Sequence, residues 1–105
     1  MSKLIPIDEA AFDARVLSAG QPIAVLFSAV WCGPCRHFAP EVERVAAELG
    51  DAITVVKVDV DASPLLATRY GVRSVPTLVV LKGGEVAARQ VGTISEVALR
   101  RFLAG

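Results

Sequence analysis

The chain has 105 residues, 53% of them hydrophobic, and its 11 basic residues are balanced by 11 acidic ones. This length suits a single domain over residues 1–105, and the even charge balance argues against a nucleic-acid-binding face. The first ten residues contain no long apolar run, which argues against a signal peptide, and no stretch reaches the length of a membrane span. We therefore expect a cytoplasmic protein, in a compartment where thiols are kept reduced.

Strands and helices alternate in the predicted elements of the first half of the chain. A near-continuous apolar run at 23–29 is typical of a strand that is covered on both faces. The apolar residues of 34–49 recur at helical spacing, and Pro34 is tolerated in a first helical turn. In chain order, the predictions are a strand over 4–5, a helix between Asp8 as its N-cap and Gly20, a strand over 23–29, a helix over 34–49 and a strand over 53–60.

The second half of the chain ends in a predicted hairpin and a helix. Ser63 or Asp61 starts a short helix, Ser95 caps the last helix, and Lys82-Gly83-Gly84 is a hairpin turn signal. The predicted elements are a helix over 64–70, strands over 77–81 and 85–91, and a helix over 96–103. Alternating strands and helices favour parallel pairing, and the hairpin adds an antiparallel part. We predict an α/β fold with a mixed central sheet of about five strands, flanked on both faces by about four helices.

The only two cysteines, Cys32 and Cys35, lie where a buried strand leads into a helix. The carboxyl end of a strand is a usual position for a site in an open α/β sheet. At a helix N-terminus, free N–H groups favour a negative charge, which lowers the thiol pKa of Cys32 and makes it the nucleophile. Cys35 lies one turn deeper, so we expect it to be more buried and to act as the resolving thiol. Gly33 leaves the backbone bare beside Cys32, and Pro34 stiffens the first turn.

Three uses of this cysteine pair compete. C-x-x-C near a strand–helix–strand pattern, in a chain without an export signal, favours a reversible redox couple. A structural zinc or iron–sulfur site needs four ligands, whereas this chain offers two cysteines and His37, so a metal would require a second copy of the protein. A purely structural bridge would stabilise little, because it closes a loop of about four residues. The redox couple without a metal is therefore the favoured interpretation.

Three segments carry a resemblance to a known family. They are WCGPC at 31–35, KVDVDASPLLATRYGVRSVPTL at 57–78 and GGEVAARQVG at 83–92. Together they make the chain similar to the thioredoxin family over essentially its whole length. The resemblance implies the thioredoxin fold and a protein disulfide reductase without a bound cofactor, in which the dithiol itself carries the electrons. It also implies a monomer whose partners are client proteins with disulfides and a thioredoxin reductase, which is an NADPH-dependent flavoprotein.

The resemblance also assigns residues to a substrate-binding surface. Val75-Pro76 matches the family's cis-proline loop, whose backbone pairs with a substrate segment like an added strand. Gly92 matches a glycine on the same surface, and Trp31 matches the tryptophan that flanks the reactive cysteine. From the residues alone, three other interpretations stay open: Trp31 as a core residue, Pro76 as a strand-start proline and Gly92 as a turn glycine.

Two positions depart from the family's pattern. Leu26 stands where the family typically has a buried aspartate, and Ser28 stands where it typically has an aromatic residue. The resemblance implies that this aspartate takes the proton of the resolving cysteine, which leucine is unable to do. Lys57 matches a lysine near that aspartate, and it either reaches solvent along its stem or is desolvated and, while neutral, accepts the proton of Cys35. Transfer of the proton to water is the alternative.

Two other functions stay open at this point. A thioredoxin-like binding subunit would hold a partner without turnover, and the departure at Leu26 is compatible with it, although the intact WCGPC argues against it. A disulfide isomerase or oxidase would act in an oxidising compartment. The missing signal peptide and the Gly33-Pro34 dipeptide both argue against that second function.

Overall fold

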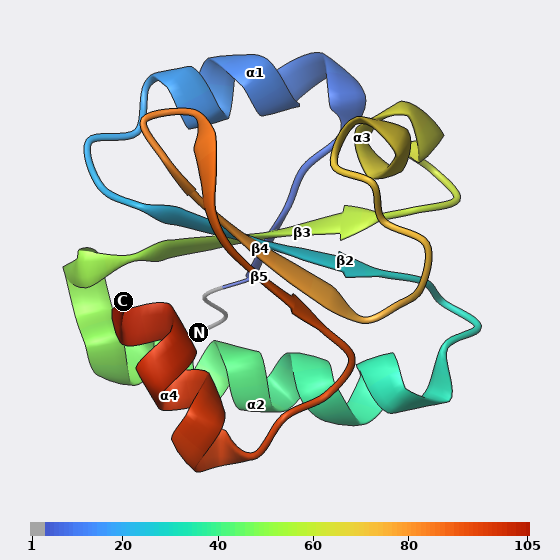
Figure 1. The fold of residues 1–105 in the computed structure, drawn as a ribbon. Helices are drawn as coiled ribbons and strands as arrows, with labels where there is room; N and C mark the ends of the chain where they lie inside the picture. The colour runs from blue at the N-terminus through green and yellow to red at the C-terminus, as the bar shows by residue number, and fades with distance from the viewer. Residues whose placement is uncertain (1–3) are drawn as a thin grey trace.

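The computed structural model describes residues 4–105, which form five strands and four α-helices (Figure 1). In chain order, the elements are β1 (Leu4–Pro6), α1 (Glu9–Leu17), β2 (Ile23–Ser28), α2 (Gly33–Leu49), a 3₁₀ turn (Gly50–Ala52), β3 (Thr54–Asp59), α3 (Pro64–Arg69), β4 (Thr77–Lys82), β5 (Glu85–Val91) and α4 (Glu96–Ala104). The predicted order of strands and helices is confirmed, and every bound except the end of α1 lies within one residue of the predicted one.

The strands form one sheet with the order β1-β3-β2-β4-β5. β1, β3 and β2 run parallel, whereas β4 is antiparallel to both β2 and β5. Figure 1 shows α1 and α3 above the sheet and α2 and α4 below it. Because helices cover both of its faces, the central strand β2 is buried along its whole length. The predicted mixed sheet with helices on both faces is confirmed.

Alternate residues of β2 anchor the two helical layers. On one face, Leu26 belongs to a buried cluster that includes Phe38 of α2 and Leu99 of α4. On the other face, Phe27 belongs to a buried cluster with Phe12 of α1. Fully burying one such side chain contributes about 1.5–3 kcal/mol. The strand that leads to the cysteines is therefore held firmly on both sides.

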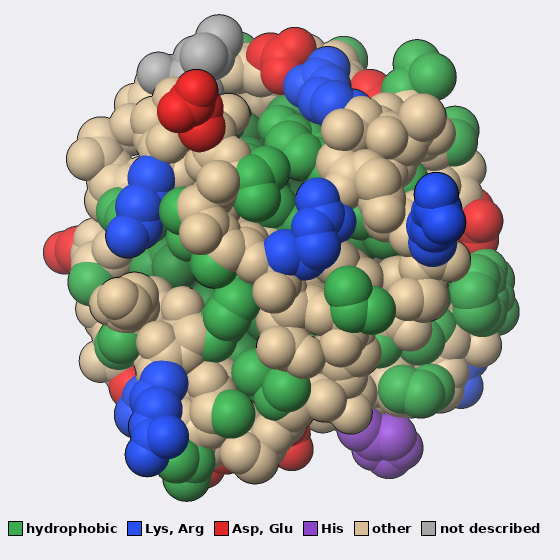
Figure 2. All heavy atoms as spheres, in the orientation of Figure 1, with side chains coloured by type: hydrophobic (Ala, Val, Ile, Leu, Met, Phe, Trp, Pro, Cys, Tyr) green, Lys and Arg blue, Asp and Glu red, His purple; other side chains and the backbone are tan. Residues whose placement is uncertain are grey.

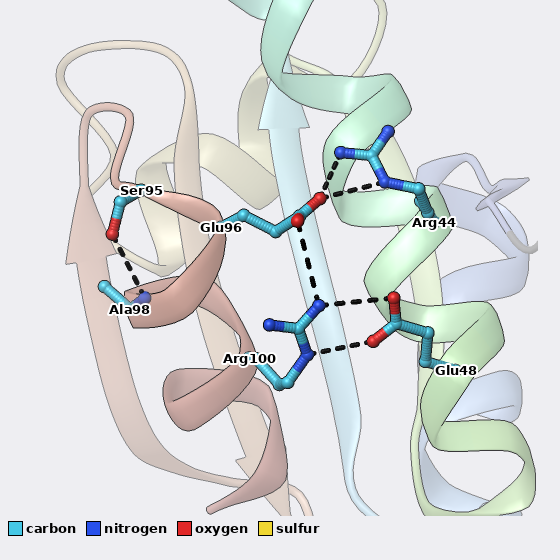
Figure 3. Close-up of polar contacts among 6 residues, drawn as sticks. All are labelled: Arg44, Glu48, Ser95, Glu96, Ala98 and Arg100. Atoms are coloured by element: carbon cyan, nitrogen blue, oxygen red, sulfur yellow. Dashed lines mark hydrogen bonds and ion pairs between the residues drawn. The ribbon is translucent and has the colours of Figure 1, made fainter.

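Two predicted helix caps are confirmed. The carboxylate of Asp8 accepts a hydrogen bond from an N–H in the first turn of α1 at 3.0 Å. The hydroxyl of Ser95 accepts one from the first turn of α4 at 3.2 Å (Figure 3). Each cap satisfies a backbone donor that has no partner within its helix.

The predicted start of α3 at Ser63 is confirmed, but a distant residue and not the Ser63 side chain stabilises the N-terminus of this helix. Ser63 occupies the N-cap position, but its side chain makes no capping hydrogen bond. Instead, a carboxylate oxygen of Glu9, at the start of α1, accepts hydrogen bonds from the N–H groups of Leu65 at 2.6 Å and Leu66 at 3.3 Å. A negative charge at a helix N-terminus is favourable. Glu9 thus ties α3 to α1 from a distant part of the sequence, where local capping rules give no signal.

The predicted hairpin turn between β4 and β5 is confirmed. Gly83 and Gly84 both have positive φ, 60° and 83°. Positive φ at both central residues is the requirement of the type I′ turn that suits the twist of paired strands. The hairpin sets β5 at the edge of the sheet.

A charged network joins α2 to α4, as Figure 3 shows. Arg44 of α2 pairs with Glu96, and Arg100 of α4 pairs with Glu48 at 2.9 Å and with Glu96 at 3.8 Å. The hydrogen bond from Arg100 lowers the pKa of Glu48. All four side chains are partly exposed, so water and salt screen the network and each pair contributes little on its own.

Figure 2 shows the surface in the orientation of Figure 1, and Lys and Arg side chains stand apart on this face and do not form one patch. This agrees with the even charge balance of the sequence. Within residues 4–105, none of the helices combines the length and the apolar character needed to cross a membrane.

Candidate active site

The two cysteines lie at the edge of the sheet where β2 and β3 end and β4 begins. Cys32 is the N-cap residue of α2, and Cys35 lies in the first turn of that helix. Gly33 and Pro34 between them are exposed. The position is the carboxyl end of two parallel strands, which is where the sequence predicts a site.

The sulfurs of Cys32 and Cys35 form a disulfide, with the two Cα atoms 5.3 Å apart. The N–H of Cys35 donates a hydrogen bond to Sγ of Cys32 at 3.1 Å. After reduction, this N–H and the dipole of α2 favour a negative charge on the sulfur of Cys32. The arrangement therefore suits a disulfide that opens to give a nucleophilic thiolate at Cys32.

The predicted difference in burial between the two cysteines is wrong. Cys32 is 4% exposed and Cys35 is 5% exposed. The two residues pack with Ala29 in a small buried cluster, against which Val60 and Val75 lie. Because the segment that carries Val75 covers Cys32, the place of Cys32 at the helix end does not leave it open to solvent. The burial of Cys32 therefore depends on the segment around Val75, and it is not predictable from the position of Cys32 in the helix.

The loop before β4 lies against Cys32. The carbonyl oxygen of Val75 is 3.8 Å from Sγ of Cys32, and the Val75–Pro76 peptide bond is cis, as the family resemblance implies. The N–H of Gly92 donates to the carbonyl oxygen of Pro76 at 2.8 Å. Gly92 has a φ of 83°, and a Cβ there would meet no other protein atom within 4 Å. Backbone conformation, rather than crowding inside the protein, thus favours glycine at this position.

Trp31 lies on the surface beside the disulfide, so its interpretation as a core residue is wrong. The side chain is 65% exposed, and its Nε1–H donates to Oδ2 of Asp61 at 2.7 Å. Asp59 fixes that loop, because its Oδ1 accepts from the N–H groups of Asp61 at 2.8 Å and Ala62 at 3.1 Å. The sequence does not single out Asp61 as a partner of Trp31. The only signal is its place just beyond β3, at the same edge of the sheet.

A groove of about 610 Å³ opens beside Cys35. Its polar lining includes Ser28 at the end of β2, Arg36 of α2, and Lys57 and Asp59 of β3. Lys57 and Asp59 also line a second groove, which does not include Cys35. The structure thus brings the predicted Lys57 and Cys35 to the same groove.

Leu26 lies in the core, and Lys57 is its neighbour on the adjacent strand. In the sheet, Leu26 is in register with Lys57 of β3 and with Leu78 of β4. Lys57 is partly exposed and borders both grooves. This partial exposure is compatible with a Lys57 stem that runs toward solvent.

The remaining polar residues near the cysteines form no metal centre in the described part of the chain. No three His, Cys, Asp or Glu side chains come together there in a way that could hold a metal ion. His37 is exposed on α2. Arg36 donates from Nη2 to the carbonyl oxygen of Val30 at 2.9 Å, which ties the first turn of α2 to the segment before Trp31.

The chain matches the thioredoxin family model over residues 3–105. It belongs to the thioredoxin family. A thioredoxin of Rhodospirillum rubrum is 44% identical over 93 residues, which is 89% of each chain. A thioredoxin of Haemophilus influenzae is 38% identical over 103 residues, covering 98% of this chain and 96% of that protein. A bifunctional thioredoxin reductase/thioredoxin of Mycobacterium leprae is 42% identical over 99 residues, covering 94% of this chain and 22% of that protein.

Membership of this family defines the chemistry of the cysteine pair. Thioredoxin family proteins are thiol–disulfide oxidoreductases that use a redox-active disulfide. This chain has that disulfide at Cys32 and Cys35. It is therefore a thiol–disulfide reductase, and the binding-subunit and isomerase or oxidase alternatives are not favoured.

Proposed function

We propose that the chain reduces client disulfides in two steps, with Cys32 attacking and Cys35 resolving. The Cys32 thiolate attacks one sulfur of the client disulfide, the client S–S bond breaks, and a mixed disulfide forms. The Cys35 thiolate then attacks Sγ of Cys32, which releases the client sulfur as a thiolate that takes a proton from solvent, and closes the Cys32–Cys35 disulfide. The hydrogen bond from the Cys35 N–H to Sγ of Cys32, at 3.1 Å, carries this assignment because it favours the thiolate at Cys32.

We assign client docking to the surface formed by Trp31, Val75, Pro76 and Gly92. A client strand that pairs with the backbone at Val75 would bring its disulfide close to Cys32, whose sulfur is 3.8 Å from the Val75 carbonyl oxygen. The 65% exposed Trp31 side chain offers apolar contact area next to that strand. Because such pairing uses main-chain hydrogen bonds, it reads little client sequence, which suits a general reductase.

Three further residues support the cysteines in this proposal. Gly33 leaves room for the client backbone, and Pro34 stiffens the first turn of α2. Lys57 acts as a cation, because a positive charge near the groove favours the Cys35 thiolate. The Lys57→Met variant should resolve the mixed disulfide more slowly at pH 7 than the wild type. Its plot of resolution rate against pH should be shifted to higher pH. An unchanged profile would contradict the role of Lys57.

We further propose that residues 1–105 act as one domain and as a monomer in the cytoplasm. Each turnover leaves the protein oxidised, so a reductant must restore the dithiol. A thioredoxin reductase, a flavoprotein that uses NADPH, is the partner of choice. The Mycobacterium leprae relative supports this pairing, because its name describes a thioredoxin reductase and a thioredoxin in one protein.

Insulin reduction with dithiothreitol as the reductant tests the proposed function. The wild type should speed the precipitation of the reduced insulin B chain, whereas Cys32→Ser and Cys35→Ser should not. Coupling to a bacterial thioredoxin reductase should give NADPH oxidation only with the wild type. A wild type that fails to reduce insulin, or a biological role that survives both substitutions, would favour a binding subunit instead.

A further inference from the structure

Ser28 is a buried polar residue that no part of the reaction described so far uses. It is the last residue of β2, it is 3% exposed, and it lines the groove beside Cys35. Within the described residues, its hydroxyl makes no hydrogen bond, and no side-chain nitrogen or oxygen that is fully shut off from solvent lacks a partner. The Ser28 oxygen must therefore face the groove, where a small polar molecule can reach it.

We propose that the Ser28 hydroxyl holds a water molecule in this groove and that this water accepts the proton of Cys35 during resolution. This inference rests on the proposed resolving role of Cys35. A hydroxyl can donate one hydrogen bond and accept others, so it can orient a water toward a thiol. The groove, at about 610 Å³, has room for several waters. Ser28 is thus a positioning residue that acts through water.

The step balances without any further reactant. The Cys35 S–H bond breaks, its proton passes to the water, and from there it goes to bulk solvent through the open groove. The Cys35 thiolate then forms the bond to Sγ of Cys32 while the bond between Cys32 and the client sulfur breaks. The client leaves as a thiolate and takes a proton from solvent.

The surroundings of Cys35 favour water over a side-chain base at this step. Leu26, which stands where the family typically has an acid, is a core residue without a group that can accept a proton. Among residues 4–105, four charged side chains line the groove with Cys35: Arg36 and Glu43 of α2, and Lys57 and Asp59 of β3. With two cations and two carboxylates, the groove has no net charge from these groups, and it is open to solvent. A water held by Ser28 can therefore pass the proton to solvent without leaving an uncompensated charge in the groove.

The experiment separates attack from resolution in one reaction. The reduced protein is mixed with an excess of an aromatic disulfide whose thiolate absorbs in the visible range. The first equivalent of thiolate reports attack by Cys32, and the second reports resolution by Cys35. Below the ordinary thiol pKa of about 8.5, Ser28→Ala should slow the second phase by at least about 10-fold and leave the first unchanged. Well above that pH, Cys35 is already a thiolate, and the difference should disappear.

Two further variants serve as controls. Ser28→Thr keeps a hydroxyl on the same strand and should restore the second phase at pH 7. Ser63→Ala removes a hydroxyl that is equally buried and lines the neighbouring groove without Cys35, so it should leave both phases unchanged. Cys35→Ser should release only one equivalent of thiolate. After the reaction, the wild type should contain the Cys32–Cys35 disulfide and no bound aromatic thiol, as measured by its mass. A wild type that ends with an aromatic thiol on each cysteine would contradict the resolving role itself, and not merely the role of Ser28.

Three results would overturn the proposal for Ser28. The first is wild-type resolution by Ser28→Ala at pH 7. The second is an equal slowing at pH 7 and pH 10, which is the mark of a purely structural effect. The third is failure of Ser28→Thr to recover the rate while its first phase remains normal.

Discussion

Leu26→Asp is the substitution that most sharply tests the description of the strand behind the cysteines. Leu26 is 1% exposed and lies in the buried cluster between the sheet and helices α2 and α4. Removing its side chain from that cluster forfeits about 1.5–3 kcal/mol of apolar burial. Burying an uncompensated polar group adds about 1–3 kcal/mol. The total, about 2.5–6 kcal/mol, is a large part of the 5–15 kcal/mol typical of a domain.

The carboxyl introduced by this substitution should also make stability depend on pH. Burial disfavours its charged form, so its pKa in the folded protein should lie above the value of about 3.9 expected in the unfolded chain. The folded state then binds more protons than the unfolded state, and stability falls as pH rises from about 4 through the folded-state pKa. Each unit of upward shift costs about 1.36 kcal/mol at neutral pH. Below about pH 4 this extra loss is absent.

Urea unfolding of the wild type, Leu26→Asp and Leu26→Asn between pH 3 and pH 8 measures both effects. Leu26→Asn is the matched control, because it has a similar shape and polarity but does not titrate. It should be destabilised by a similar amount at every pH, whereas Leu26→Asp should lose additional stability toward neutral pH. Equal stability of the two variants across the range would refute the buried, dry environment that we assign to Leu26.

Three further predictions follow: two concern contacts away from the cysteines, and one concerns the docking surface. Glu9→Ala should destabilise the protein by about 1 kcal/mol through loss of the α3 cap, whereas Glu9→Gln, which keeps an acceptor oxygen, should lose less in the same thermal-unfolding assay; equal losses would contradict capping. Glu48→Gln should be less stable than the wild type above the unfolded glutamate pKa of about 4.3, and the difference should vanish as pH falls through the lowered folded pKa of Glu48. At neutral pH this difference should shrink in 1 M salt, and a salt-independent difference would argue against the ion pair with Arg100. Trp31→Ala should raise the KM for insulin several-fold while leaving reaction with a small aromatic disulfide unchanged, and an unaltered KM would remove Trp31 from the docking surface.

Most of the fold follows from patterns that act over short stretches of sequence. The apolar run of β2, the helical stripe of α2 and the glycines of the hairpin each reflect local geometry, and the structure has each element where it is predicted. The caps at Asp8 and Ser95 are local as well, because the side chain and the N–H that it binds are three residues apart. The cap of α3 is not local, since Glu9 is 56 residues from Leu65, and it was therefore missed.

In the candidate site, too, the local features follow from the sequence, whereas the contacts between distant segments do not. The position of Cys32 at a helix N-terminus follows from the sequence, and so does the short separation of the two sulfurs. The equal burial of Cys32 and Cys35 does not follow, because it depends on a loop 43 residues away that brings Val75 over Cys32. The contact between Trp31 and Asp61 likewise depends on the end of β3 lying beside the end of β2. Sequence patterns predict the elements well, and they predict poorly which side chains meet across them.

The groove beside Cys35 shows how a departure from a family pattern becomes interpretable only in three dimensions. In the sequence, Ser28 is simply a small polar residue where the family typically has an aromatic one. In the structure, it is buried, its hydroxyl makes no hydrogen bond within the described residues, and it lines the same groove as Cys35. A single position that looks unremarkable along the chain thereby gains a specific role in proton transfer.

Mass spectrometry of a trapped mixed disulfide shows which of the two cysteines attacks the client. Reduced Cys35→Ser and reduced Cys32→Ser are each mixed with a disulfide-containing client under non-reducing conditions. We expect Cys35→Ser to accumulate a stable adduct in which the client is bonded to Cys32, and Cys32→Ser to form little or none. Adducts of equal yield on both variants, or an adduct found mainly on Cys35, would contradict the assignment of Cys32 as the attacking thiol.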